Sequence, residues 1–197
     1  MTNRTYHSSL ISVAALVVVA TGSVVAAQRL DASAPPKAPV HAPHLTYIDE
    51  PTAAQRETIS WAVGRFVAAG MQLPDLDVRF PVFCDGKGAV YHVGESSIDF
   101  CRVYRKNVLH EFAHAWDDTS GAVDRAGFMK LRGVSVWFGG LDVPFADQGS
   151  EHLAIIIAWG LMDPGTGSAH GLPNNSDADL TKAFEFLTQS SQAAGAA

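Results

Sequence analysis

The sequence of 197 residues has few cysteines, few charged residues and no excess of basic ones. Its two cysteines are too few for a disulfide-dense miniprotein, and they lack the paired CxxC spacing of a structural zinc site. Charged residues make up 17% of the chain, which excludes a coiled coil or a charge-rich disordered protein. The formal net charge of −6 argues against a nucleic acid or an anionic membrane as partner, since both select for Lys and Arg.

An apolar segment near the N-terminus indicates export. Arg4 precedes an uncharged run at residues 10–20, and a second apolar patch ends in the small residues 25–27. This combination is typical of a signal peptide, so residues 1–27 are predicted to be a cleaved signal or, if retained, a membrane anchor. The rest of the chain is therefore expected to be secreted or extracytoplasmic, with membrane contact only through an uncleaved N-terminal segment.

A segment rich in Pro and Ala follows this signal. Each Pro removes a backbone donor and fixes φ, so residues 28–44 are expected to form a semi-rigid linker. Residues 45–190 then form a single domain that is long enough to bury a substantial core, and residues 191–197 form a flexible tail.

Hydrophobic periodicity and turn residues predict an α+β fold for this domain. The segment 151–162 is apolar on nearly all sides, so its helix must be buried. We expect a small antiparallel sheet packed on an active-site helix and on this second, buried helix. The expected strands are 76–83, 89–93 and 97–103, and the expected helices are 49–71, 104–118, 124–131, 151–162 and 176–189.

The two cysteines, Cys84 and Cys101, flank the region expected to form the hairpin. In an exported protein, two cysteines at strand ends are expected to form one disulfide. Such a bond would contribute roughly 3 kcal/mol to stability in the chain-entropy model.

The strongest functional signal is the sequence HEFAH at residues 110–114, an HExxH motif within the helix expected at 104–118. Residues four apart lie on the same helical face, so His110 and His114 can present imidazole nitrogens to one metal ion. Glu111 lies about 100° around the helix, where it can reach a water on that ion. The alternative is a helix whose two histidines only make hydrogen bonds.

A catalytic zinc site needs a third protein ligand and an open fourth position. One common extension of the motif places Gly three and His six residues after the second His, but here these positions hold Asp117 and Ser120. The best remaining ligand is Glu151, because a carboxylate beside a buried helix costs free energy unless it is paired or bound to a metal. The alternative is a first-turn carboxylate at a solvated helix end, which the helix dipole favours.

Three other residues compete with Glu151 for this role. His152 is the next residue along the chain and is a rival ligand, although we expect it instead to hydrogen-bond a ligand or the substrate. Asp142 and Asp147, on the Gly-rich loop, are weaker rivals.

The arrangement resembles the zincin-like HExxH metallopeptidases, in particular the compact gluzincin-type exported bacterial members. The resemblance covers about residues 85–161: an edge strand at 98–103, the helix with HEFAHAWD, a loop, and a helix bearing a Glu. It implies that Glu111 is the general base and that one Zn²⁺ ion is bound by three ligands. Those ligands would be His110, His114 and Glu151.

The sequence departs from the gluzincin pattern at Ile155, where such enzymes often carry an acidic residue that steadies a ligating His. That carboxylate must then be supplied by Asp117 or Asp118, or be missing. The sequence also leaves open which residue would stabilise the oxyanion. The candidates for it are Tyr91, Tyr104, His152 and His170.

The expected function is therefore a secreted zinc metallopeptidase acting on a peptide or protein substrate. Zinc would activate a water, Glu111 would accept its proton, and the edge strand would hold an extended peptide. One alternative is an exported zinc-binding domain of the same fold without peptidase activity, which the loss of the acidic residue at Ile155 favours. Another is a metal-free interaction module with a groove lined by Trp116, Trp137, Phe138 and Trp159.

Overall fold

The computed structural model of the chain describes residues 40–121, 123–140 and 142–194. The signal peptide or anchor expected at 1–27 lies outside these residues, as does the linker up to residue 39. The end of the linker is held by backbone donors, since His41 N–H donates to Gln72 and His44 N–H to Asp75.

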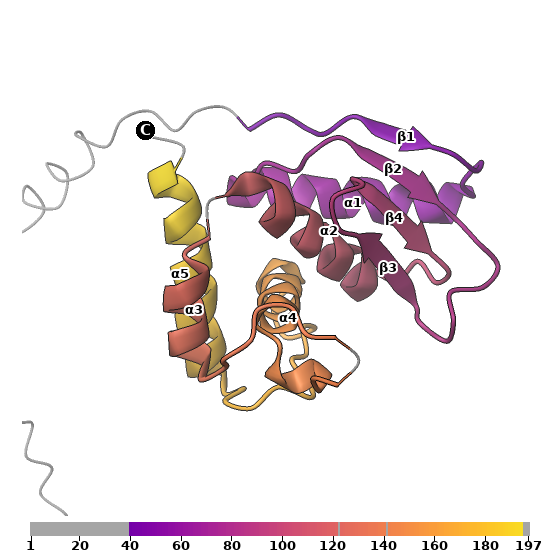
Figure 1. Cartoon of the computed structure of the whole chain (residues 1–197). Helices are drawn as coiled ribbons and strands as arrows, with labels where there is room; N and C mark the ends of the chain where they lie inside the picture. The colour runs from indigo at the N-terminus through magenta and orange to yellow at the C-terminus, as the bar shows by residue number, and fades with distance from the viewer. Residues whose placement is uncertain (1–39, 122, 141, 195–197) are drawn as a thin grey trace, which may run out of the picture. The chain divides into compact units, whose positions relative to one another are not determined.

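A mixed four-stranded sheet forms one layer of the domain (Figure 1). β2 is parallel to β1 and to β4, and only β3 and β4 are antiparallel, so the expectation of an antiparallel sheet is wrong for two of the three pairings. The physical reason is that α1 (Ala53–Ala69) crosses over between β1 and β2 and so makes them parallel. The strands are β1 (Leu45–Tyr47), β2 (Leu76–Arg79), β3 (Ala89–His92) and β4 (Ser97–Phe100), in the order β1-β2-β4-β3.

The edge strand next to the HExxH helix is β3, which corrects the expectation that the strand at 98–103 is the edge. β4 lies inside the sheet between β2 and β3, with Tyr91 of β3 opposite Ile98 of β4. The N–H of Tyr91 donates to the carboxylate of Glu111 rather than to β4. The edge of β3 that does not pair with β4 therefore faces the motif.

Within the described residues, five α-helices lie where the sequence predicts them, with shifted ends. α1 begins at Ala53 and not at residue 49, because Thr52 and Gln55 form a reciprocal capping box that starts the helix after Pro51. A short 3-10 helix, η3 (Phe145–Asp147), lies in the Gly-rich loop. The other helices are α2 (Arg105–Ser120), α3 (Arg125–Arg132), α4 (Gly149–Leu161) and α5 (Asp177–Ala194).

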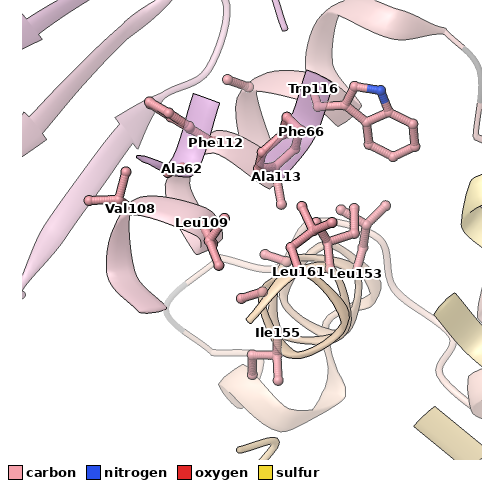
Figure 2. Packing of buried hydrophobic residues seen from close by; sticks show 14 of the residues in the cluster. Ala62, Phe66, Val108, Leu109, Phe112, Ala113, Trp116, Leu153, Ile155 and Leu161 are labelled. Atoms are coloured by element: carbon pink, nitrogen blue, oxygen red, sulfur yellow. The ribbon is translucent and has the colours of Figure 1, made fainter. Parts of the chain in front are cut away.

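The helices form the second part of the domain, and the core lies between them and the sheet. In Figure 1, α1 and α2 lie against one face of the sheet, α4 packs on α2, and α3 and α5 pack together beside α4. Val78 and Ile98 from the sheet are fully buried, and the rings of Phe66 and Phe112 meet edge to face at 6.0 Å between α1 and α2 (Figure 2). The prediction that the apolar helix α4 is buried is confirmed.

The predicted disulfide is also confirmed. Cys84, in the loop after β2, is bonded to Cys101, directly after β4, with their Cα atoms 6.0 Å apart. A disulfide is compatible with an extracellular location. In the part of the chain that the structure describes, no helix has the length and apolar character needed to span a bilayer.

Candidate metal centre

Helix α2 brings the two histidines of the motif together. No Pro or Gly interrupts it, and it ends at Gly121, whose φ of 57° is the left-handed conformation that closes many helices. The Nε2 atoms of His110 and His114 lie 3.2 Å apart, and the two rings are nearly perpendicular at 86°. Both imidazoles can therefore direct a lone pair toward one point.

The third predicted ligand, Glu151, lies on α4. Glu151 Oε2 lies 3.2 Å from His110 Nε2, and Glu151 Oε1 lies 3.6 Å from His114 Nε2. One ligand atom from each of these three residues lies within 4.8 Å of the other two, and all three side chains are partly buried. The structure thus assembles a group that could hold a metal ion from the residues that the sequence singled out.

The electrostatics of this group suit a bound cation. Burial by itself would raise the pKa of Glu151, but the close contacts and charges of His110 and His114 outweigh it and lower that pKa to about 2. Burial alone would lower the pKa of His114, yet the carboxylates of Glu151, Glu111 and Asp117 together raise it. The site therefore holds a carboxylate that stays ionised and a field that favours positive charge.

One atom of the group is left without a partner. Glu151 Oε2 is buried and, although close to His110 Nε2, it makes no well-aligned hydrogen bond within the described residues. A buried carboxylate oxygen in that state costs free energy. Two imidazole nitrogens and a carboxylate oxygen are ligands that zinc accepts, so the residues present fit such an ion.

Glu111 lies between α2 and the edge strand. Its side chain is only 8% exposed, and its Oε2 accepts the Tyr91 N–H at 2.8 Å. The backbone of β3 therefore fixes one carboxylate oxygen of the predicted general base.

A pocket of about 260 Å³ opens beside His110 and Glu111. Ile155, which stands where the resemblance expects an acid, forms part of its wall together with residues from α2, β3 and η3. His170, one of the four oxyanion candidates, also lines it. The full lining is Gly88, Ala89, Lys106, Asn107, His110, Glu111, Phe145, Ile155 and His170.

Asp117 was one of two candidates to steady a ligand histidine, and the structure gives it other partners. It is 2% exposed and accepts hydrogen bonds from Trp137 Nε1 and Arg125 Nε, each at 3.1 Å. Burial raises the pKa of Asp117, and Arg125 opposes that rise. The backbone carbonyl of Trp137 in turn accepts the Ser150 N–H at the start of α4. Asp117 thus connects α2 to the first turn of the helix that carries Glu151.

Asp118, the other candidate for that role, faces the sheet. Its Oδ2 accepts the Tyr91 hydroxyl at 2.7 Å and the Gly94 N–H at 2.8 Å. It therefore fixes the β3–β4 hairpin against α2. No hydrogen bond between either aspartate and a ligand histidine is present among the described residues.

His152 lies away from the ligands' meeting point and is fully buried. Its Nε2 is 2.7 Å from the Ala146 carbonyl, and its Nδ1 is 3.4 Å from Arg132 Nε. An acceptor Nδ1 leaves the proton on Nε2, and burial with the nearby Arg132 lowers the pKa of His152. His152 thereby anchors η3 to α4.

The remaining candidates lie apart from the metal group. Tyr104, which precedes α2, is 61% exposed, and Asp142 and Asp147 are exposed on the loop before α4. Sequence reasoning missed Phe145, whose ring stacks on His110 at 6.3 Å, because an irregular loop has no periodicity to reveal it. It also missed Lys106, although a residue four positions before His110 shares its helical face.

Comparisons of the chain with protein-family models, with curated proteins and with solved structures find no match. The function must therefore be argued from the geometry and chemistry of the site.

Proposed function

We propose that this protein is an exported zinc metallopeptidase of the zincin-like, gluzincin type. The observation that carries the proposal is the convergence of His110, His114 and Glu151 from two helices, with Glu111 lining the same pocket as His110. The disulfide favours the exported state.

The donor set favours a catalytic zinc over a structural one. Structural zinc sites are closed by four protein ligands, whereas catalytic sites have three and keep one position open. Within the described residues, the group contains two histidines and one glutamate. A pocket adjoins it, lined by His110 and Glu111, so a substrate has access to the open side.

The protein side chains then perform the proton transfers. Bound zinc supplies Lewis acidity and lowers the pKa of a water. Glu111 accepts the proton of the attacking water on its free oxygen and later delivers it to the leaving amine. Tyr91 N–H, 2.8 Å from the other oxygen, holds the carboxylate in place during both transfers.

The edge strand supports a peptide substrate. β3 is antiparallel to β4 and lies at the border of the sheet beside α2. An edge strand can hold an extended peptide through the main-chain groups that it does not already use, and of those on β3 the Tyr91 N–H is used by Glu111. A peptide bound along β3 would therefore pass the base and the ligands in an extended conformation.

The experiment that tests this function separates metal binding from chemistry. Glu111→Gln keeps an acceptor for Tyr91 N–H but removes the base, so it should retain zinc and lose about 10²- to 10⁴-fold in turnover of a quenched-fluorescent peptide library. His110→Ala should lose both zinc and activity. Metal content is measured by plasma mass spectrometry. The control is Glu57→Gln, the same change at an exposed position of α1.

Each outcome is informative. Normal turnover in Glu111→Gln would refute its role as the base. A wild-type protein that binds zinc but cleaves no library member would instead be a metal-binding domain without peptidase activity. A wild-type protein that binds no divalent metal would refute the metal centre.

A further inference from the structure

The pocket beside the metal group contains a lysine whose charge is not balanced. Lys106 lies in the first turn of α2 and is half-buried, and its Nζ is 3.4 Å from the hydroxyl of Ser168. No carboxylate within the described residues lies in ion-pair distance of it. The neighbouring Arg105, by contrast, pairs with Asp163 at 3.1 Å.

This position is unfavourable for a cation. The N-terminus of a helix carries partial positive charge, and the first turn of α2 contains no acidic residue to offset it. Partial burial adds a desolvation cost for the ammonium group. A negatively charged ligand in the pocket would remove both costs.

The geometry places that charge one helical turn from the metal group. Lys106 and His110 are four residues apart on α2, so their side chains are neighbours, with Cβ atoms about 5–6 Å apart. Both residues line the same pocket. A group bound by Lys106 would thus belong to a substrate residue directly beside the scissile bond.

The rest of the pocket matches a short acidic side chain. Ala89 and Ile155 offer apolar walls for methylene groups, and Asn107 and His170 offer polar atoms. Glu111 is the only acid in the lining. With a divalent cation present, the charges of Glu111 and Glu151 balance that cation, which leaves Lys106 as the net charge of the region.

We propose that this pocket binds a carboxylate on the substrate residue next to the scissile bond, and that Lys106 selects it. The inference rests on the proposed peptidase function and extends it to a substrate class. The carboxylate belongs either to an Asp or Glu side chain or to the C-terminal residue of a short peptide. The volume of about 260 Å³ is smaller than a typical ligand site and suits one side chain.

The activity test uses matched peptides. Peptides with Glu or Gln on either side of the scissile bond, each with a free or an amidated C-terminus, distinguish the two sources of the carboxylate. Wild type should prefer the carboxylate in kcat/KM by about tenfold or more, as for a hydrogen bond to a charged group. Lys106→Met should lose that preference and Lys106→Glu should reverse it. Lys182→Met, an exposed lysine on α5, should change neither value.

A binding test supplies a readout that does not depend on turnover. In the zinc-loaded Glu111→Gln protein, calorimetry should show tighter binding of the Glu peptide than of the Gln peptide. Adding Lys106→Met should equalise the two affinities. A folded Lys106→Met protein is verified by its unchanged circular dichroism.

The outcomes separate this inference from the proposed function. Cleavage without a preference for a carboxylate, or with a preference that persists in Lys106→Met, overturns the inference and leaves the peptidase intact. If no peptide is cleaved, the peptidase fails, and binding decides the inference. Selective binding that depends on Lys106 supports a carboxylate pocket, whereas equal affinities overturn it.

Discussion

Gly149 is a position where one added methyl group should disturb both stability and metal binding. It is the first residue of α4, two residues before Glu151. A Cβ at this position would lie 2.7 Å from Cε3 and 3.1 Å from Cζ3 of Trp137, and 3.2 Å from Cγ of Met129. The indole ring would have to move, because real Cβ atoms do not approach so closely.

The expected cost of Gly149→Ala follows from these contacts. Overpacking of this kind costs about 1–3 kcal/mol. A displaced ring would also weaken the bond from Trp137 Nε1 to Asp117, and hydrogen bonds to charged groups contribute about 1.5–3 kcal/mol. The higher helix propensity of Ala than of Gly offsets this cost by about 1 kcal/mol at most. We expect a net loss of about 2 kcal/mol and a weaker affinity for zinc, because the start of α4 carries Glu151.

The assay compares the same substitution at two sites. Gly64, in the interior of α1, has no atom within 4 Å of a built Cβ. Gly64→Ala should therefore stabilise the protein by up to about 1 kcal/mol and leave zinc affinity unchanged. Urea denaturation and a competing zinc indicator provide the two measurements. A Gly149→Ala protein as stable as wild type, with full zinc affinity, would refute the reasoning.

Two further predictions concern the hairpin. Replacing both Cys84 and Cys101 with Ser should lower the free energy of unfolding by about 3 kcal/mol, and reductant should bring wild type to the same value. Tyr91→Phe should cost about 1.5–3 kcal/mol at neutral pH, because it removes the bond to Asp118. Burial and Asp118 raise the pKa of Tyr91 above its unfolded value of 10.0. The stability advantage of wild type over Tyr91→Phe should therefore shrink as the pH rises above that value. Urea unfolding at increasing pH measures it, and a difference in unfolding free energy that stays constant would contradict the prediction.

The three residues of the candidate metal group could be predicted because their signals are local. Helix geometry alone fixes the spacing of His110 and His114, and the absence of Pro and Gly from this segment favours a continuous helix. Glu151 followed from the cost of a carboxylate beside a buried helix, which is also a property of its own segment. The cysteine pairing followed from there being only two cysteines in the chain.

The features that could not be predicted depend on which segments meet in space. β1 has three residues, too few to show alternation, so neither the strand nor its parallel pairing with β2 was visible. β4 lies inside the sheet because it pairs with β2 as well as with β3, and its parallel pairing with β2 has no local signal either. Whether His152 contacts a ligand or anchors a loop depends on where η3 lies, and no local pattern reports it.

The two aspartates after the motif show how local and distant information combine. Asp117 and Asp118 are adjacent on α2 and therefore project about 100° apart. Asp117 accepts a hydrogen bond from Trp137, whose carbonyl accepts the Ser150 N–H at the start of α4, and Asp118 accepts one from the Tyr91 hydroxyl on β3. Any sufficiently stable helix can present two histidines. The geometry of the candidate site therefore depends on how Glu151 and the edge strand β3 are held against that helix. Asp117 contacts the segment that leads into α4 and Asp118 contacts β3, although neither hydrogen-bonds His110 or His114 within the described residues.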